Sequence, residues 1–320
     1  MISVFSFCMD LSVIICTHDP RENYLTRVLN GLKSQTLPAS EWELLLVDNA
    51  SASPVSARID LSWHPHARTI CEEQLGLTHA RLRGIRESNG QILVFIDDDN
   101  VLCPDYLAVA LQTMRKNALL GVLGAGRILP EFEAPPAAEV IPFLNSLGLR
   151  DEPRAHYSNE TTHHTPALPY GGGLCVLRKF AQSYLDSCRI RTVATSLGRS
   201  GEDLLSGEDI DLALHACREG YLAGVIPELQ LTHLIPSSRV DPNYLVRLAA
   251  GHAVANYHLA RLWGWNSGDM QNPILKRLRY WKSKAKLKGL ARRIFTAINQ
   301  GTEQARRQWQ ENSASQCRVD

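Results

Sequence analysis

The first hundred residues alternate between continuous apolar runs and stretches whose apolar residues recur with helical spacing. Continuous apolar runs are typical of strands that are covered on both faces. Strands are therefore predicted at 11–17, 42–48, near 69–71 and at 92–96. Apolar residues spaced three and four apart predict helices at 24–35 and 77–88. A β-α-β-α-β order of this kind favours an α/β fold with a doubly wound, mostly parallel sheet and flanking helices.

The second half of the chain has a less regular pattern. Residues 130–169 are rich in proline, histidine and charge, which predicts a flexible excursion or lid. Strands are expected at 121–129, 174–177, 222–226 and 229–235, and helices at 209–220 and 243–263.

Polar residues stand where three of the predicted strands end. Thr17 closes the first run, Asp48 the second, and Asp97 to Asp99 follow the run that ends at residue 96. Ligands bind beyond the carboxyl ends of the strands in such sheets. Three adjacent carboxylates repel one another unless a cation or hydrogen bonds compensate, so they indicate a divalent metal with oxygen ligands. The alternative is a solvated acidic turn before a helix that begins near Cys103-Pro104-Asp105.

A second acidic group, Glu208, Asp209 and Asp211, follows Gly207 at the start of a predicted helix. A helix N-terminus favours carboxylates, so a charged cap is one interpretation. The other is a rigidly held general base. His233, after an apolar run, is either structural or a ligand of a metal or a diphosphate.

Two glycine-containing motifs differ in what they predict. Gly171-Gly172-Gly173 lets the backbone approach a ligand closely, or forms a plain turn. Gly124-Ala125-Gly126 is not a dinucleotide loop, because Leu129 stands where the third glycine belongs.

Composition and charge restrict the class of protein. The chain is 44% hydrophobic and 21% charged with a formal net charge of +1, as in a soluble globular protein, and gives no global signal for nucleic acid. The eight cysteines include no CxxC pair, so neither a zinc site nor a disulfide framework is expected, and a cytoplasmic location fits. No apolar stretch is long enough to predict a membrane span. Met9 is a possible true start, which leaves the first eight residues as a tail.

Taken together, the motifs resemble those of family 2 glycosyltransferases. The resemblance covers residues 11 to 240 and rests on six segments: 13–20, 47–51, 76–81, 95–100, 172–178 and 207–212. It implies a GT-A fold and an inverting transfer of a sugar from a nucleotide-diphosphate donor, with UDP as the expected nucleotide. It also implies Mn²⁺ or Mg²⁺ as cofactor and a glycan or lipid-linked acceptor, in polysaccharide or cell-envelope glycan synthesis.

The resemblance assigns roles residue by residue. Asp209 is the expected catalytic base, with Glu208 beside it. Asp99 is the expected metal ligand, together with Asp97 and His233. The expected donor-binding residues are Thr17, Asp19, Asp48, Arg81, Asp97, Asp98, Gly172 and Gly173. The sequence departs from the family pattern at His18, where an aromatic residue is common, and at Leu82, where asparagine is common.

Three other functions stay open from the residues alone. A retaining double displacement requires a second carboxylate on the opposite face of the sugar. A sugar-phosphate nucleotidyltransferase requires a glycine- and arginine-rich loop after the first strand, and Thr17-His18-Asp19-Pro20 is not one. A nucleotide-sugar-binding protein without catalysis is disfavoured, because both acidic groups are intact.

The C-terminal part has a charge pattern of its own. From Met270 to Thr302 there is no Asp or Glu, whereas residues 276–298 carry nine Lys and Arg among apolar residues. A basic amphipathic helix there predicts peripheral contact with the inner face of the cytoplasmic membrane. A helix packed on the catalytic domain is the alternative, and a nucleic-acid partner is not expected. The predicted organisation is a tail at 1–10, a GT-A domain at 11–265 and a basic helical extension at 266–320.

Overall fold

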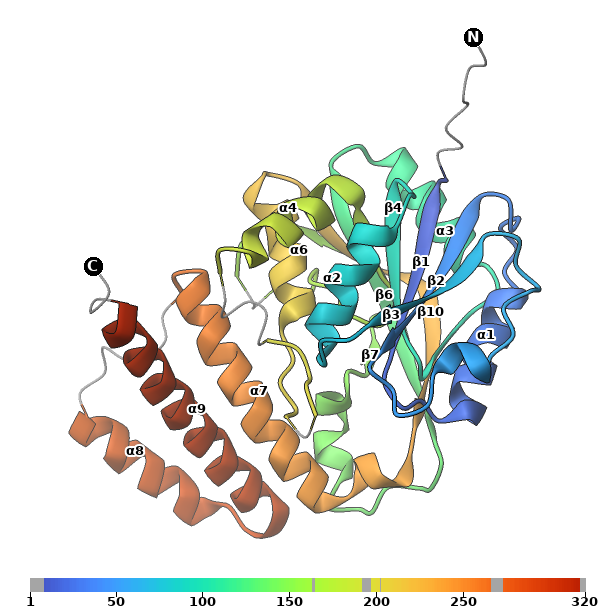
Figure 1. Cartoon of the computed structure of the whole chain (residues 1–320). Coiled ribbons are helices and arrows are strands. Elements are labelled where there is room, and N and C mark those ends of the chain that lie inside the picture. Colours follow the sequence, from blue (N-terminus) through green and yellow to red (C-terminus); the bar gives the residue numbers. More distant parts are fainter. Residues whose placement is uncertain (1–8, 163–164, 192–196, 202, 266–272, 317–320) are drawn as a thin grey trace. The chain divides into compact units, whose positions relative to one another are not determined.

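The computed structural model describes residues 9–162, 165–191, 197–201, 203–265 and 273–316 (Figure 1). The chain divides into two compact units. Unit 1 consists of Met1–Glu131, Leu149–Thr195 and Glu208–Leu234, and unit 2 of Phe132–Gly148, Ser196–Gly207 and Ile235–Asp320. Most of the predicted N-terminal tail, residues 1–8, lies outside the described residues.

Unit 1 is built on one mixed sheet. In the order β3-β2-β1-β4 the strands are parallel, and β9 then pairs antiparallel with β4 and with β6. The long strand β10 pairs antiparallel with β5 and β8. The strands are β1 (Leu11–Thr17), β2 (Trp42–Asn49), β3 (Ala67–Glu72), β4 (Ile92–Asp97), β5 (Asn100–Leu102), β6 (Leu120–Phe132), β7 (Arg150–Asp151), β8 (His156–Ser158), β9 (Leu174–Leu177) and β10 (Leu222–Ile235).

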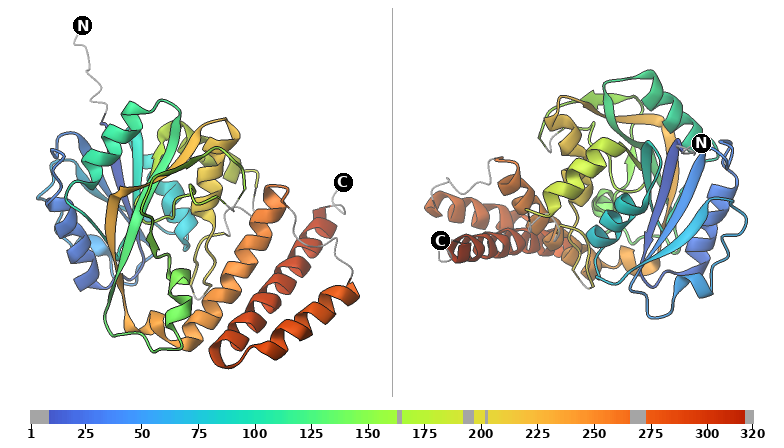
Figure 2. Two further views of the ribbon diagram at one scale, coloured as in Figure 1. Left: turned by 180° about the vertical axis from the view of Figure 1, so that it is seen from behind. Right: turned by 45° about the horizontal axis from the view of Figure 1, so that its top comes forward.

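Helices cover both faces of this sheet because its central strands are apolar on both sides. Val13 and Ile15 of β1 belong to a buried cluster that also contains residues of α1 (Glu22–Lys33) and α3 (Tyr106–Lys116). The intervening Ile14 faces α2 (Leu77–Glu87), where Gly84 leaves room for it. Figure 2 shows these layers from two further sides. The remaining elements of unit 1 are η1 (Val55–Ala57), α4 (Arg178–Cys188) and α6 (Glu208–Arg218).

One continuous strand replaces the two short strands expected at 222–226 and 229–235. β10 runs unbroken from Leu222 to Ile235 and passes through Pro227. A proline interrupts a ladder only where its missing N–H is needed. Gly126 of β6 lies opposite, and a Cβ there would stand 2.5 Å from the Ile226 oxygen and 2.7 Å from the Pro227 nitrogen. The glycine therefore lets the two backbones pass closely, and the strand continues.

The segment 130–169 also contains more regular structure than its composition predicts. It holds the 3₁₀ helix η2 (Ile141–Leu147) and the short strands β7 and β8. β7 pairs with β6 and β8 with β10, so the middle of the segment is tied to the sheet of unit 1.

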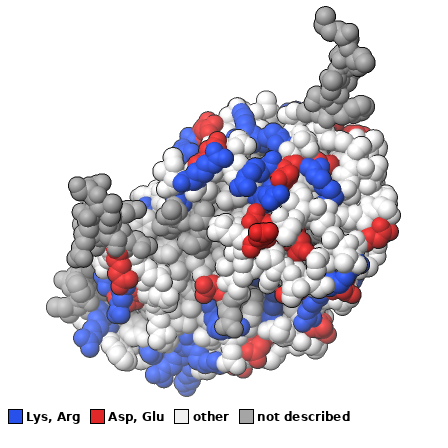
Figure 3. All heavy atoms as spheres, in the orientation of Figure 1, with Lys and Arg blue, Asp and Glu red and all other residues white. Residues whose placement is uncertain are grey.

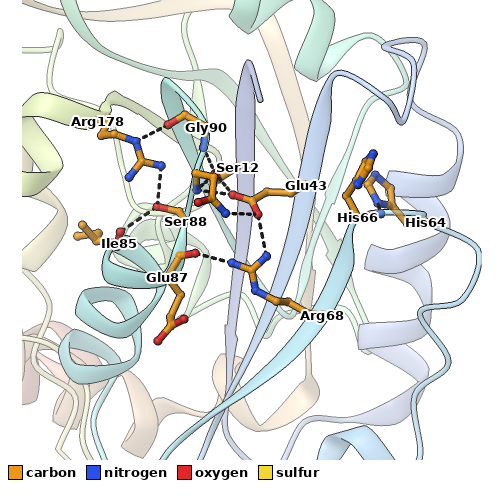
Figure 4. Close-up of polar contacts among 11 residues, drawn as sticks. Ser12, Glu43, His64, His66, Arg68, Ile85, Glu87, Ser88, Gly90 and Arg178 are labelled. Carbon is orange, nitrogen blue, oxygen red and sulfur yellow. Dashed lines mark hydrogen bonds and ion pairs between the residues drawn. The ribbon is translucent and has the colours of Figure 1, made fainter. Parts of the chain in front are cut away.

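A buried polar network joins the amino-terminal ends of β1 and β2 to the chain after α2 (Figure 4). Glu43 accepts a hydrogen bond of 2.6 Å from the Ser12 hydroxyl and pairs with Arg68 at 2.9 Å. Burial alone would raise the pKa of the Glu43 carboxyl, but hydrogen bonds from Ser12 and Asn89 outweigh it and hold that pKa below its ordinary value. Arg178 donates to the Gly90 carbonyl at 2.7 Å. The network holds together the end of the sheet opposite Asp97, Asp98 and Asp99.

Unit 2 contains the helices η3 (Ser237–Val240), α7 (Pro242–Leu262), α8 (Pro273–Lys286) and α9 (Gly289–Gln316). Asp241 caps α7 by accepting from the backbone N–H groups of Asn243 and Tyr244. The single basic helix expected at 276–298 is in fact two helices, because Gly289 turns the chain with a φ of +51°. Across the described ranges, no helix combines the length and the apolar character needed to cross a bilayer.

We expect the contact between α7 and α9 to require a glycine at 301. A Cβ there would lie 2.5 Å from the Ala250 carbonyl oxygen, a backbone atom that cannot turn away. Gly301→Ala should therefore lower the free energy of unfolding by about 1–3 kcal/mol, even though alanine favours a helix more than glycine does. Urea denaturation measures the change. Thr302→Ala, one residue further along α9, is the control, and an equal loss in both variants would contradict the prediction.

Candidate functional site

Parallel pairing brings the polar strand ends of unit 1 together. Thr17 of β1 is the register partner of Asp48 in β2, and Cys16 is the partner of Asp97 in β4. The candidate site thus lies at the carboxyl end of the parallel strands, as the sequence predicts. Cys16 lies below it, where burial raises the pKa of the thiol to about 12. This cysteine is a neutral packing residue and not a thiolate.

The three consecutive carboxylates each contact a different group. Asp97 pairs with the Arg81 guanidinium at 3.2 Å, and Asp98 accepts a short hydrogen bond from the Thr17 hydroxyl. The Asp99 Oδ2 lies 3.6 Å from His233 Nε2. These partners come from three different elements, α2, β1 and β10, so the carboxylates do not share one partner. Each of them is compensated within unit 1.

Asp99 and His233 meet because β5 and β10 are paired. His233 is the register partner of Asn100, the residue after Asp99, and the Leu234 N–H donates to the Asp99 carbonyl at 2.8 Å. Both side chains are about nine-tenths buried. The Asn100 amide also donates to the Asp99 carboxylate. The sequence placed His233 on a strand, but only the pairing of β10 with β5 brings it to Asp99.

Arg81 joins the two acidic groups of the sequence. Its guanidinium donates to Glu208 at 2.8 Å and to Asp97 at 3.2 Å, across 127 and 16 residues of chain. Arg81 and Glu208 are buried, whereas the Asp97 side chain is 38% exposed. Burial alone would lower the pKa of the guanidinium, but Glu208 and Asp97 raise it above its ordinary value. Arg81 therefore stays charged and holds both carboxylates in place.

Asp209 is fixed by backbone donors at the start of α6. One of its oxygens accepts from the Gly171 N–H at 2.7 Å, and the other from the Ile210 N–H at 2.8 Å. Asp209 lies in the first turn of α6, at the positive end of the helix dipole. Each carboxylate oxygen has a second lone pair, so Asp209 retains the capacity to accept a proton or a further hydrogen bond.

The glycines before β9 permit close approach of the backbone to these side chains. A Cβ at Gly171 would lie 2.4 Å from the Arg81 guanidinium, and one at Gly172 would lie 2.0 Å from the Asn100 side chain. Gly173 has a φ of +79°, and its carbonyl accepts from the Tyr106 hydroxyl at 2.7 Å. These glycines are required for packing within the site itself, which explains the motif without a ligand.

The loops after β1 and β2 are tied to each other. Asp48 accepts from the backbone N–H groups of Ser51 and Val55, at 3.2 and 2.8 Å. Asp19, with a φ of +44°, accepts from the Ala52 N–H at 2.9 Å, and the His18 ring lies 2.8 Å from the Asn49 carbonyl. Asp48 and Asp19 thus shape the rim of the site through loop contacts.

Three positioning residues escaped the sequence analysis: Asn49, Asn100 and Tyr106. The Asn49 side chain donates to the Glu72 and Gln74 carbonyls and accepts from the Gly76 N–H, so it closes the loop before α2. Asn49 and Asn100 each directly follow a predicted acidic strand end and lie within segments 47–51 and 95–100 of the resemblance, but neither was assigned a role. Tyr106 gave none, because its partner Gly173 is remote in sequence.

The side-chain atoms of Asp97, Asp99 and His233 suit a divalent cation whose coordination is completed by a bound ligand. No group of three or more His, Cys, Asp or Glu converges on one point among the described residues. Asp99 and His233 form a pair, and the Asp97 side chain is more exposed than either of them. Mg²⁺ and similar ions are commonly held by one or two carboxylates plus the phosphates of a substrate. The residues present therefore fit such an ion without a complete protein cage.

Removal of the Arg81 charge should strand a buried carboxylate. We expect Arg81→Leu to lower the free energy of unfolding by about 3–5 kcal/mol, because Glu208 loses its partner. Glu208→Gln in the same chain should restore part of that stability, and urea denaturation of the two single variants and the double variant measures it. The control is Arg83→Leu, whose partner Glu87 is partly exposed. Strict additivity of Arg81→Leu and Glu208→Gln would refute the coupling.

Comparison with known proteins gives this site a context. Residues 12–135 match the family described as glycosyl transferase family 2. Glycosyltransferase AglE of Haloferax volcanii is 37% identical over 92 residues, which are 28% of this chain and 30% of the relative. Putative glycosyltransferase EpsH of Bacillus subtilis is 29% identical over 103 residues, 32% of this chain and 30% of the relative. The matches thus span about a third of the length of these relatives.

Solved structures agree on the fold. The structure of S. aureus TarS 1–349 in complex with UDP-GlcNAc has a TM-score of 0.52 and 16% identity, over 79% of this chain and 71% of that one. The structure of GalNAc-T7 with UDP, GalNAc and Mn²⁺ has a TM-score of 0.50 and 15% identity, over 82% and 53%. At such identities the likeness shows the fold alone, and it confirms the GT-A arrangement. Residues 12–135 of this chain are thus similar in sequence to glycosyl transferase family 2, and the described residues share the fold of the two glycosyltransferase structures above.

Proposed function

We propose that the chain is an inverting glycosyltransferase that moves a sugar from a nucleotide-diphosphate donor, with UDP as the nucleotide, to a glycan or lipid-linked acceptor. The observation that carries the proposal is the Arg81 bridge. It holds Asp97, at the end of β4, and Glu208, at the start of α6, on one guanidinium. The family resemblance assigns the first group to the donor and the second to the acceptor. One buried cation thus sets the spacing between the two partners of the reaction.

The donor end of the site is the rim formed by the loops after β1 and β2. Thr17, Asp19 and Asp48 stand at this rim, and the loop contacts of the two aspartates leave carboxylate lone pairs for a base or ribose. UDP-GlcNAc and UDP appear in the structures of similar fold, which supports a nucleotide-sugar as donor. Asp98, held by Thr17, connects this rim to the acidic cluster.

Asp99, His233 and Asp97 would hold Mn²⁺ or Mg²⁺ together with the donor diphosphate. When bound, such an ion stabilises negative charge on the leaving diphosphate as a Lewis acid. The protein fixes the two inner ligands in advance: Asn100 and the β5–β10 pairing orient Asp99 toward His233. The more exposed Asp97 is held from below by Arg81.

Asp209 is the general base of the proposed reaction. It takes the proton of the acceptor hydroxyl as that oxygen attacks the anomeric carbon. The bond from the anomeric carbon to the diphosphate oxygen breaks, and the nucleoside diphosphate leaves with the electron pair. A single displacement of this kind inverts the anomeric centre. The backbone N–H groups of Gly171 and Ile210 orient the carboxylate before the acceptor arrives.

The base assignment makes a specific prediction for Asp209→Asn. Asparagine retains an oxygen for the Gly171 N–H but has no carboxylate to accept the hydroxyl proton, so transfer should fall about 10²–10⁴-fold. Donor binding should persist, as thermal stabilisation by a UDP-sugar would show. Asp105→Asn, an exposed change before α3, is the control and should leave transfer intact. Transfer by Asp209→Asn at the wild-type rate would eliminate Asp209 as the base.

The metal assignment is tested through binding without turnover. A panel of nucleotide-sugars is screened for thermal stabilisation with Mn²⁺ and with EDTA. The stabilising donor should lose most of its effect in EDTA and in Asp99→Ala, while Asp105→Ala should behave as wild type. Full stabilisation by the donor in EDTA would refute the role of Asp99. Stabilisation by a nucleoside triphosphate with a sugar phosphate, but by no nucleotide-sugar, would instead favour nucleotidyl transfer.

A further inference from the structure

Helix α8 exposes a short apolar stripe. Leu278 is 61% and Trp281 is 55% exposed, and the two residues are three positions apart. Ala285, four positions after Trp281, is exposed as well. Residues at these spacings lie on one face of a helix. Exposed large apolar residues that adjoin one another on one face indicate a contact surface more strongly than isolated ones do.

The stripe is separate from the side of α8 that packs within unit 2. Tyr280 stacks on Phe295 of α9, with ring centroids 5.5 Å apart and planes at 20°. Leu287, seven positions after Tyr280 and so on the same side, is half-buried. At 3.6 residues per turn this side lies away from Leu278 and Trp281. The contact between α8 and α9 is therefore made without the stripe, which remains available.

Basic residues flank the stripe on both sides. On the helical wheel, Arg279, Lys282 and Lys286 follow one edge, and Arg277 and Lys284 follow the other. All except the half-buried Lys284 are exposed, as are Lys288, Arg292 and Arg293 beyond the end of α8. Acidic residues are missing from the sequence between 270 and 302. Figure 3 shows Lys and Arg gathered over the turn between α8 and α9, at the bottom of the view.

We propose that this face of α8 binds the surface of an anionic lipid bilayer. Leu278 and Trp281 would enter the boundary between headgroups and acyl chains, where tryptophan is preferred. The flanking Lys and Arg would meet the anionic headgroups, with their long side chains reaching out beside the apolar stripe. The phosphates of a nucleic acid would also pair with the basic residues, but they offer no apolar region to bury the exposed leucine between the two basic rows. The proposal is independent of the proposed glycosyl transfer.

Vesicle co-sedimentation of the full chain tests the proposal. The wild type should sediment with vesicles of equal parts phosphatidylcholine and phosphatidylglycerol, and should stay in the supernatant with pure phosphatidylcholine. Lys282→Glu with Lys286→Glu should weaken binding by at least about fivefold for each residue. Leu278→Ser with Trp281→Ser should weaken it about tenfold or more. Circular dichroism confirms that both variants keep their helices.

The matched control lies in unit 1. Lys116→Glu with Leu119→Ser makes the same kinds of change at the end of α3, where Leu119 is 62% exposed and lacks a basic row on each side. It should bind the anionic vesicles as the wild type does. Absence of wild-type binding to anionic vesicles, or equal binding by the α8 variants, would overturn the proposal. So would binding of duplex DNA or RNA that is lost with the lysines but kept without Leu278 and Trp281.

Discussion

The arrangement of the site depends on a single buried cation. Arg81 comes from the first turns of α2, Asp97 from the end of β4 and Glu208 from the start of α6, and the two carboxylates meet at the guanidinium. A buried charge is tolerated only when it is paired and hydrogen-bonded, so the three side chains constrain one another. Gly171 is part of the same constraint, because a side chain there would occupy the space of Arg81. The backbone N–H of Gly171 also donates a hydrogen bond to the Asp209 carboxylate, which links Asp209 to the same constraint.

The acidic residues of the site are thus held before any ligand binds. Asp97, Asp98 and Asp99 point to Arg81, Thr17 and His233, and Asp209 is gripped by two backbone N–H groups. Preorganised groups need little rearrangement when charge develops during a reaction. The cost of gathering carboxylates is offset inside unit 1 by one arginine, by hydroxyl and amide donors and by a helix N-terminus. Because several different groups offset the repulsion between the carboxylates, the acidic cluster does not need a complete set of protein ligands around a metal.

Unit 2 is held together by apolar packing between helices, and one face of α8 takes no part in that packing. Its helices α7 and α9 approach closely at Gly301, and its small buried cluster contains Val254, Tyr257 and Ala305. α8 adds to this bundle through Tyr280 and leaves its apolar stripe and basic rows outward. A helix that is needed only for packing would bury Trp281 and Leu278 first, since they offer the largest apolar area in that part of the helix. Their exposure separates the role of α8 from the stability of the unit.

The sequence by itself determined the parallel strands of this protein and the positions of its acidic groups. Continuous apolar runs fixed the strands β1, β2 and β4, because a strand covered on both faces tolerates few polar residues, and the carboxylates at 97–99 and 208–209 were visible where those patterns stop. Local patterns cannot show which distant residues meet. Strand order and helix packing decided the contacts of Arg81 with Asp97 and Glu208, of His233 with Asp99, and of the Asn49 side chain with the loop before α2. The continuity of β10 through Pro227 depended on a glycine in a neighbouring strand. The break at Gly289 depended on a left-handed backbone that composition does not display. Tertiary structure decided these points because each depends on contacts or backbone angles that become fixed only when the chain packs.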